Sequence, residues 1–582
     1  MKKKKNLAFD ESKISKIAVL VLIIMPLIVF FQSVGFSFVW DDLPLYINNN
    51  HFPSENPFQN IFSFFVPKSN EMYIPLTYFF WSILSFCSGS EFNPVVFHFF
   101  NIIIHTINGI IIYYTLKLIF KDSLTSLFGA LIFALHPIQV EAVAWVSELR
   151  GLLSGLFGFL AVYFYLYYYQ NKFNSEQIHK NQNRGINDKY TPRLKYLFFT
   201  GFSLILSVLS KPSGVVFPII IFLLDMMLIR DNIFKAIKRI WIFLLLIIPV
   251  FILTLFSETE SKTNLSVGFL NRPLIFLDSI GFYIKQIIYP LDLAANYGRT
   301  PSFVLENPLS LIIHIILAVT LLLIFLFKQN KKLLFGYLIF IAGFLPVSGL
   351  VTFYYQLFST VADRYLYFSM FGASIIFTCL ISEIKKQNTR NIFSVIYLFV
   401  LTIVTFTHLP VWKNEISLWN NTIKKYPDIS AYSYFARGSA LMETGKNQEA
   451  ILDFTAAIRL DTTLELAYYN RGNIYFDIGN YSGAIADYSS SLKFNPNNLN
   501  AFINRGLSYL EINMYEKAIT DFSLALDIDT NYSDVYVNRG IAYANLGNLE
   551  AAIKDFQNAL RINPDDEIAK ENLKLALKSK NK

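Results

Sequence analysis

The residues best suited to chemistry are ionisable side chains that stand beside long apolar segments. They are Asp41, Asp42, His136, Glu141, Arg150, Lys211, Asp363, Arg364 and Tyr365. An ionisable group at membrane depth or at a helix mouth costs several kcal/mol unless it faces a partner or a cavity. Each of these residues is therefore a candidate for function.

The mixture of acids and bases in this set is suited to group transfer from a lipid phosphate. Asp41 or Asp42 could take the proton of an acceptor hydroxyl as a general base. Arg150, Lys211 and Arg364 could bind the donor phosphate and stabilise the negative charge that grows on it. Four further residues are predicted to support the site: His136, Glu141, Asp363 and Tyr365.

Each of these residues also has a structural interpretation, which the sequence leaves open. Asp41 and Asp42 could cap a helix after Trp40, and His136 could be a hydrogen-bonded histidine of the interior. Glu141 with Arg150, or Asp363 with Arg364, could be structural ion pairs, and Lys211 could be a lysine that extends to the membrane interface.

The composition indicates a membrane protein with a second, polar part. The chain has 582 residues, of which 54% are hydrophobic and 16% charged, and its mean hydropathy is +0.41. Soluble proteins carry about 25% charged residues. Residues 1–411 have a net charge of +11 and residues 412–582 a net charge of −3, so the basic excess lies in the apolar part and does not indicate nucleic acid as a partner. The two cysteines, Cys87 and Cys379, exclude a disulfide framework.

Residues 1–411 are predicted to form a membrane domain with eleven transmembrane helices. A spanning helix needs about 20 mostly apolar residues. Runs that meet this criterion lie near 17–36, 95–116, 124–140, 151–170, 195–210, 213–229, 240–256, 308–327, 333–351, 365–382 and 392–409. The first run lacks a small-residue cleavage site, which indicates a retained helix. Residues 37–94 and 257–307 are two long outer loops, and the second has an amphipathic pattern around Phe282 and Ile288.

The distribution of Lys and Arg predicts the orientation. If the N-terminus is cytoplasmic, the inner segments carry 24 of these residues and the outer segments of the same domain carry 8. All the candidate residues then fall on the extracytoplasmic side. An odd number of spans also places the chain after Leu409 outside the cytoplasm.

The C-terminal part repeats with a period of 34 residues. Arg-Gly pairs begin at Arg437, Arg471, Arg505 and Arg539, and alanines recur at 450, 484, 518 and 552. This pattern resembles the tetratricopeptide repeat and predicts an α-solenoid with a concave binding surface. We expect residues 412–430 to be a linker with a degenerate repeat helix, 431–566 to be four repeats and 567–582 a capping helix and tail. The repeated arginines could attract an acidic partner or could be consensus residues that hold the helices together.

The order of these motifs resembles the transmembrane-and-tetratricopeptide-repeat family of O-mannosyltransferases and their bacterial relatives, within the GT-C superfamily of membrane glycosyltransferases. The matching segments are Val39-Trp40-Asp41-Asp42, His136-Pro137, Glu141 to Trp145, Ser210-Lys211-Pro212-Ser213-Gly214, Asp225, Gly281-Phe282-Tyr283, Tyr289-Pro290-Leu291, Ala362-Asp363-Arg364-Tyr365-Leu366-Tyr367, Trp412-Lys413-Asn414-Glu415 and Leu418-Trp419.

The resemblance implies an all-α fold, a catalytic acid in the first outer loop and a polyprenyl-phosphate sugar as donor, with no nucleotide-sugar domain. It also implies direct attack of a serine or threonine hydroxyl with inversion at the sugar carbon, one of Asp41 and Asp42 being essential. Glu148-Leu149-Arg150 departs from the family pattern by one inserted leucine. Gln139 stands where eukaryotic members have a second histidine, and no other His/carboxylate cluster has a metal-binding spacing, so no metal or other cofactor is expected.

The sequence therefore predicts a glycosyltransferase that moves a sugar, mannose being one candidate, from a polyprenyl phosphate to a protein hydroxyl outside the cytoplasm. The repeats would bind the acceptor or an accessory protein. The alternative is a membrane-anchored repeat scaffold without enzyme activity, although an anchor needs only one span. A transporter is a third class, but transporters place their ionisable groups near mid-membrane. The C-terminal residues lack a retention signal, which favours a bacterial inner membrane over the endoplasmic reticulum.

Overall fold

The computed structural model describes residues 11–42, 61–67, 72–89, 93–181, 194–229, 232–257, 267–428 and 430–581. The chain divides into two compact units, Met1–Asn421 and Thr422–Lys582, which we call the membrane unit and the solenoid. Within the described residues every regular element is a helix, as the sequence predicts. The middle portions of both outer loops, at 43–60 and 258–266, lie outside the described residues.

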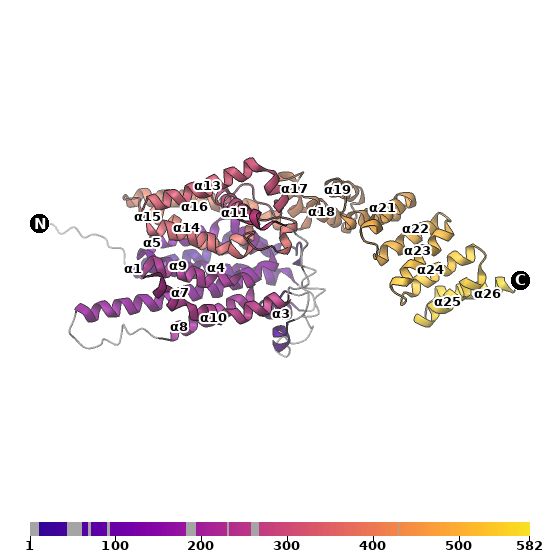
Figure 1. Ribbon diagram of the computed structural model, residues 1–582, viewed down its shortest axis with the longest axis horizontal. Helices are drawn as coiled ribbons and strands as arrows, with labels where there is room; N and C mark the ends of the chain where they lie inside the picture. The colour runs from indigo at the N-terminus through magenta and orange to yellow at the C-terminus, as the bar shows by residue number, and fades with distance from the viewer. Residues whose placement is uncertain are drawn as a thin grey trace. The chain divides into compact units, whose positions relative to one another are not determined.

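The helices of the membrane unit run side by side along its length (Figure 1). Their bounds are α1 Glu11–Phe30, α3 Pro75–Ser88, α4 Pro94–Phe120, α5 Ser123–Leu135, α6 Val140–Ala144, α7 Leu149–Asn181, α8 Lys195–Ser210, α9 Phe217–Leu228, α10 Ile233–Ser257, α11 Arg272–Ile288, α12 Pro301–Glu306, α13 Pro308–Phe327, α14 Lys331–Phe344, α15 Ser369–Ser382, α16 Gln387–His408 and α17 Glu415–Lys425. Short 3-10 turns join several of them: η1 Phe31–Gly35, η3 Pro137–Gln139, η4 Val146–Glu148, η6 Pro212–Val216, η10 Asp363–Leu366 and η11 Leu409–Trp412.

Six helical segments of the described chain are long and apolar enough to cross a membrane, or seven if α5 and the bent η3–α6 segment form one span. They begin at Glu11, Pro94, Val146, Ile233, Pro308 and Gln387. Shorter apolar helices cover 195–210, 212–228 and 369–382, and α14 covers part of the predicted span at 333–351. Every predicted span thus contains a helix, and the number of complete crossings stays a prediction.

The ends of these helices follow from local chemistry. Asn93 caps α4 by accepting the Val95 N–H, and Pro94 starts the helix where no amide donor is needed. Lys121 ends α4 in the left-handed region with φ 58°. The Asp122 carboxylate then accepts the Leu124 and Thr125 amides at the start of α5. The sharp turn between α4 and α5 is therefore fixed by residues 121 and 122.

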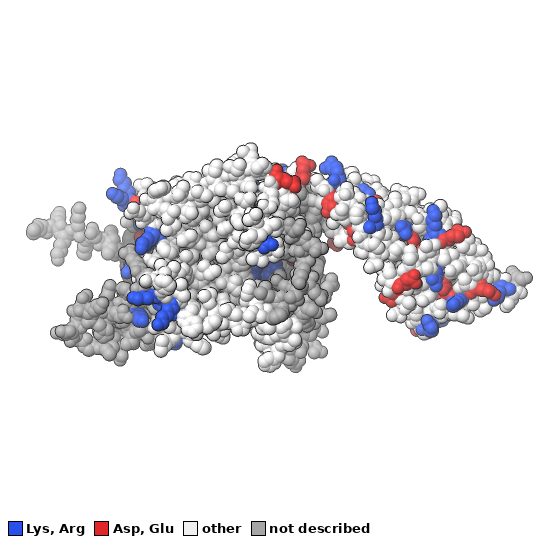
Figure 2. Space-filling view, viewed as in Figure 1, with Lys and Arg blue, Asp and Glu red and all other residues white. Residues whose placement is uncertain are grey.

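Charged side chains gather at the end of the membrane unit where α1 begins (Figure 2). Lys16 of α1 and Lys117 of α4 border the same cavity, Arg390 pairs with Asp122, and Lys328 pairs with Glu383. Figure 2 shows Lys and Arg side chains gathered over the end of the unit where α1 begins, next to a broad surface without charge. The membrane unit also exposes large apolar side chains, such as Ile28, Ile316 and Phe399, which are suited to contact with lipid.

The solenoid consists of antiparallel helix pairs that repeat as predicted. Their bounds are α18 Ala431–Glu443, α19 Asn447–Leu460, α20 Glu465–Asp477, α21 Tyr481–Phe494, α22 Leu499–Glu511, α23 Tyr515–Ile528, α24 Ser533–Asn545, α25 Leu549–Ile562 and α26 Glu567–Lys580. Glycines at 438, 472, 506 and 540 lie against the aromatic ring of the second helix, where an added Cβ would meet ring carbons at 2.6–2.9 Å. The small residues therefore permit the close approach that the 34-residue period predicts.

Each repeated arginine is bound to an aspartate of its own repeat. Arg437, Arg471, Arg505 and Arg539 pair with Asp453, Asp487, Asp521 and Asp555 at 2.6–2.8 Å. Arg505 also donates from Nη1 to Ser489 of the preceding repeat at 3.0 Å. The arginines thus hold the helices together, which supports the consensus interpretation over attraction of an acidic partner.

Candidate functional site

Most of the candidate residues meet at one end of the membrane unit. They come from the loop after η1, the segment from α6 to the start of α7, the junction between α8 and η6, and η10. We call the set the polar cluster; it contains Asp41, Asp42, Glu141, Glu148, Arg150, Lys211 and Arg364. The convergence predicted from the sequence is therefore found in the structure, although His136 and Asp363 have other partners.

Asp42 anchors the first outer loop and is fully buried. Its Oδ1 accepts the Ser147 N–H at 2.8 Å and the Ser147 hydroxyl at 2.6 Å, and its Oδ2 accepts the Val39 N–H at 3.0 Å. Burial raises the pKa of Asp42 to about 7, and the hydrogen bond from the Ser147 hydroxyl opposes the rise. With three donors already bound, Asp42 has the environment of a structural carboxylate.

Asp41 has a different environment although it is the next residue in the chain. Its Oδ1 is buried and has no hydrogen-bond partner among the described residues. Burial raises the pKa of the Asp41 carboxyl above 3.8, and the positive charges of Arg150 and Arg364 oppose the rise. Asp41 is thus the carboxylate of the polar cluster with an oxygen still able to accept a proton or a hydrogen bond.

Trp40 holds this loop in place. Its φ of 59° is in the left-handed region, which is unfavourable for a bulky residue, so neighbouring contacts must impose it. The Trp40 ring stacks on Trp145 with centroids 4.9 Å apart and packs edge-on against Trp419 at 5.3 Å. Its N–H donates to the Glu415 carboxylate, whose other oxygen accepts the Trp419 indole N–H at 2.5 Å. The first outer loop is therefore clamped by the segment that starts α17.

Arg364 lies in a cage of aromatic rings. Its guanidinium carbon is 5.2 Å from the Trp145 ring centroid and 4.3 Å from that of Tyr355. Arg364 also donates from Nη1 to Glu141, and its backbone N–H donates to the other Glu141 oxygen at 3.1 Å. Only 6% of Arg364 is exposed, so the residue packs beneath the Trp40–Trp145 stack.

Glu148 is shared by two cations. Lys211 Nζ donates to its two oxygens at 2.8 and 3.1 Å, and Arg150 Nε lies 3.3 Å from Oε1. Burial lowers the pKa of Lys211, although the Glu148 charge opposes this. Gly151 makes room for the group, because a Cβ there would stand 2.4 Å from Glu148 Oε2. Glu148 is thus shared by two cations, and Arg150 also interacts electrostatically with the Asp41 carboxylate.

The remaining predicted residues have positions at the edge of the cluster. His136 Nδ1 accepts the Ile138 N–H at 3.2 Å, and its Nε2 lies 3.0 Å from the Ile287 carbonyl. Asp363 accepts the Tyr297 hydroxyl at 2.6 Å. Tyr365 packs edge-on against Tyr355, with centroids 6.1 Å apart. These contacts match the structural interpretation of His136, whereas the ion pairs considered from sequence are replaced by Glu141–Arg364 and Glu148–Arg150.

The sequence did not assign several residues that the structure places at or near the site. Glu148, Ser147 and Glu415 stand inside or beside the quoted motifs but carried no predicted role. A second buried group joins the second outer loop to α13: Arg299 Nη2 is 2.7 Å from Asp278 of α11, and His314 Nδ1 of α13 is 2.6 Å from the same carboxylate. The sequence could have indicated this group, because its residues are also ionisable side chains beside apolar runs. In the described part of the chain, no group of three or more His, Cys, Asp or Glu residues could hold a metal ion.

The fold and the site define a class: an all-helical membrane protein with a buried polar cluster at one end of its membrane unit, followed by tetratricopeptide repeats. Family models described as tetratricopeptide repeat or TPR repeat match residues 438–479, 472–513, 499–532 and 533–566. The crystal structure of MamA is 26% identical and covers 25% of this chain and 85% of its own, with a TM-score of 0.25.

Curated relatives that the chain resembles are named protein O-mannosyl-transferases. Protein O-mannosyl-transferase F38B6.6 of Caenorhabditis elegans is 24% identical over 466 residues, which cover 77% of this chain and 63% of the relative. Protein O-mannosyl-transferase TMTC1 of Homo sapiens is 23% identical over 451 residues, covering 67% and 48%. Protein O-mannosyl-transferase TMTC3 of Homo sapiens is 31% identical over 144 residues, covering 23% and 15%. The predicted resemblance to this family is confirmed, and the chain spans less than two thirds of the length of each of these relatives.

Proposed function

We propose that the protein is a glycosyltransferase that moves a sugar from a polyprenyl phosphate to a serine or threonine hydroxyl of a protein. The observation that carries the proposal is the contrast between Asp41 and Asp42. Both oxygens of Asp42 accept hydrogen bonds, three in total, whereas Asp41 keeps a buried oxygen without a partner in the described chain. A carboxylate with a raised pKa and an unbound oxygen is suited to general base catalysis.

In the proposed reaction, the acceptor hydroxyl oxygen attacks the sugar carbon that is bonded to phosphate. The new carbon–oxygen bond forms as the bond to the phosphate oxygen breaks, and the polyprenyl phosphate leaves with the electron pair. Asp41 Oδ1 receives the hydroxyl proton. The indole Nε1 of Trp145, which is also buried and unpaired within the described residues, is a further group that a sugar or hydroxyl oxygen could satisfy.

Arg150 and Lys211 are the proposed phosphate-binding residues. They share the Glu148 carboxylate, and 11% of the Arg150 side chain and 17% of the Lys211 side chain are exposed. The cage around Arg364 favours a positioning role for that residue, since its guanidinium is occupied by Glu141 and aromatic rings. Mannose is the first sugar to test because the relatives are named O-mannosyl-transferases.

The proposed orientation has the polar cluster outside the cytoplasm. Lys16 lies near the start of α1, and Lys117 and Lys121 lie at the end of α4 beside it. Asp41 follows the opposite end of α1. A helix of 20 residues is about 30 Å long, so the two ends are a membrane thickness apart. Cytoplasmic loops carry the excess of Lys and Arg, which supports placing the cluster and the solenoid on the other side. We propose that the solenoid binds the acceptor or an accessory protein.

The test is sugar transfer in membranes supplied with radiolabelled polyprenyl-phosphate mannose and then glucose. Asp41→Asn should lower the transfer rate by about 10²–10⁴-fold, the usual contribution of a general base. Asp292→Asn is the matched control, because Asp292 is an exposed aspartate of the second outer loop, 44% exposed, and should transfer like wild type. Equal labelling by Asp41→Asn and wild type would reject Asp41 as the base. Absence of transfer by wild type from both donors would favour the scaffold hypothesis.

A further inference from the structure

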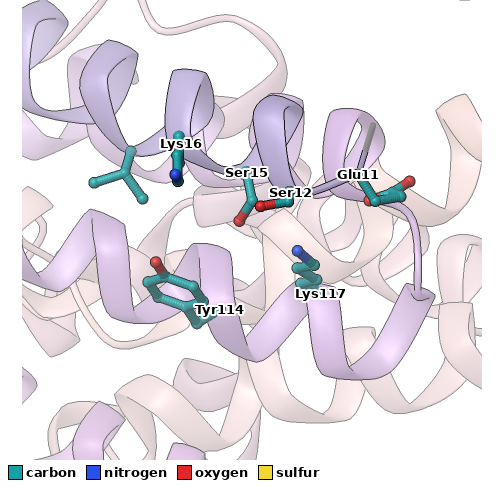
Figure 3. Close-up of a pocket in the computed structure, with 7 residues that line it drawn as sticks. Glu11, Ser12, Ser15, Lys16, Tyr114 and Lys117 are labelled. Atoms are coloured by element: carbon teal, nitrogen blue, oxygen red, sulfur yellow. The ribbon is translucent and has the colours of Figure 1, made fainter. Parts of the chain in front are cut away.

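A polar groove lies at the opposite end of the membrane unit from the polar cluster. It is a cavity of about 620 Å³ between α1 and α4, lined by Glu11, Ser12, Ser15, Lys16, Tyr114 and Lys117 (Figure 3). A neighbouring cavity of about 510 Å³ shares Glu11, Tyr114 and Lys117 and adds Lys121. The two cavities therefore border each other, and we call them together the groove; the proposed transfer reaction does not use it.

The groove presents two cations from two different helices. Figure 3 shows Lys117 reaching from α4 toward α1 and Lys16 reaching from α1 toward α4. Neither lysine forms an ion pair with a described residue. Glu11 lies at one edge of the groove, where its carboxylate accepts the Ser123 hydroxyl. The hydrogen bond from the Tyr113 hydroxyl to Ser15, at 3.1 Å, fixes the two helices beside each other.

The surroundings of the groove are those of a lipid headgroup site. Lys16 and Lys117 stand where the polar end of each helix meets its apolar run, which is the level of the phosphates in a bilayer. Directly after Lys16, α1 exposes Ile17, Leu20 and Ile24. A ligand with an anionic head at the lysines would therefore have an apolar surface beside its tail.

We propose that this groove binds the phosphate headgroup of an anionic glycerophospholipid, with Lys16 and Lys117 as the two cationic contacts and the apolar face of α1 beside an acyl chain. Basic pockets between membrane helices bind such headgroups, and each lysine close to an anionic membrane surface contributes about 1 kcal/mol. The site is independent of the proposed sugar transfer, because none of its residues belongs to the polar cluster.

The experiment measures lipid retention by the full-length protein. Delipidated protein in detergent is titrated with phosphatidylglycerol or with phosphatidylcholine of the same chains, and bound lipid is counted by native mass spectrometry. Lys16→Gln/Lys117→Gln should weaken phosphatidylglycerol binding by about 30-fold, the factor that corresponds to two such lysines, and should leave phosphatidylcholine unchanged. Lys16→Arg/Lys117→Arg should restore the affinity, which would show that the glutamine variant fails through charge and not through folding.

Lys385→Gln/Lys386→Gln is the matched control, since it removes two exposed lysines between α15 and α16. It should bind phosphatidylglycerol like wild type. Equal binding by wild type and Lys16→Gln/Lys117→Gln would overturn the proposal, and so would an equal loss in the control. A further arm adds millimolar inorganic phosphate; complete displacement of the lipid would overturn the assignment to a lipid and indicate a soluble phosphate.

Discussion

Both the membrane unit and the solenoid contain partly or fully buried ion pairs, but the pairs are arranged differently in the two units. In the solenoid, each arginine pairs with the aspartate 16 residues later, and the arrangement is repeated four times at 2.6–2.8 Å. In the membrane unit, Glu141 pairs with Arg364 across 223 residues of sequence and Glu148 pairs with Lys211 across 63. The four solenoid pairs are local and equivalent, whereas these two pairs of the membrane unit are unique and long-range.

This difference indicates what each set of pairs does. Equivalent local pairs join neighbouring helices, so their contribution to stability is spread along the solenoid. Unique long-range pairs bring distant segments to one place, which a site built from four separate loops requires. The polar cluster also leaves one carboxylate oxygen of Asp41 without a described partner. In the solenoid, each of the four repeated arginines donates to both oxygens of its aspartate. The unsatisfied group belongs to the unit that is proposed to react.

The largest loss of stability is expected when one of the long-range ion pairs of the membrane unit is broken. Glu141→Gln leaves the Arg364 guanidinium buried without a counter-charge, and removal of one partner from a buried pair costs about 3–5 kcal/mol. Thermal unfolding of the purified protein in detergent should show a large drop in midpoint. Glu306→Gln, which changes an exposed glutamate of α12, is the control and should unfold like wild type. A midpoint unchanged in Glu141→Gln would contradict the assigned pairing.

A smaller and local effect is expected in the solenoid. Arg505→Met removes the two hydrogen bonds to Asp521 and the one to Ser489, and hydrogen bonds to charged groups contribute about 1.5–3 kcal/mol. Hydrogen exchange in the full chain should accelerate in α22 and α23 and only weakly in α18. Arg561→Met replaces an exposed arginine of α25 and should leave exchange unchanged. Uniform acceleration throughout the solenoid would argue against the nearest-neighbour description.

The sequence predicted the solenoid almost completely because its information is local. The 34-residue period identifies the helix pairs and the small residues at 438, 472, 506 and 540. In the membrane unit, apolar runs predicted where the helices are and the ionisable residues predicted which segments meet. The individual partners were not predictable, because the choice of Arg364 over Arg150 as partner of Glu141 depends on how α6 and η10 pack.

The same limit applies to Asp41 and Asp42. Two adjacent aspartates after a tryptophan are equivalent in sequence, and only the fold distinguishes them. Ser147 reaches Asp42 from 105 residues away, and Glu415 fixes the Trp40 backbone from 375 residues away. The backbone of Trp40, directly before the two aspartates, has a φ of 59° in the left-handed region. No local pattern encodes that turn, since most residues with positive φ are glycines.

Asp42→Asn should separate structure from catalysis within the first outer loop. The amide can offer one oxygen where the carboxylate offers two, so either Val39 or Ser147 loses its acceptor, at a cost of about 1–3 kcal/mol. The unfolding midpoint should fall, while the transfer rate per folded molecule should stay within a few-fold of wild type. Asp41→Asn should show the reverse combination. A loss of transfer in Asp42→Asn with an unchanged midpoint would exchange the two roles.

The smallest effect is a shift in pH dependence. A base must be ionised to act, and burial raises the pKa of Asp41 while the charge of Arg150 lowers it. Arg150→Gln removes that opposing charge, so the pKa of Asp41 should rise further and the acidic limb of the kcat profile should move to higher pH. Because Arg150 is also proposed to bind phosphate, KM for the donor should increase independently of pH. Lys285→Gln removes an exposed cation of α11 and should change neither the acidic limb of the kcat profile nor KM for the donor. A limb that stays in place in Arg150→Gln would indicate that the group titrating in the rate profile is not Asp41.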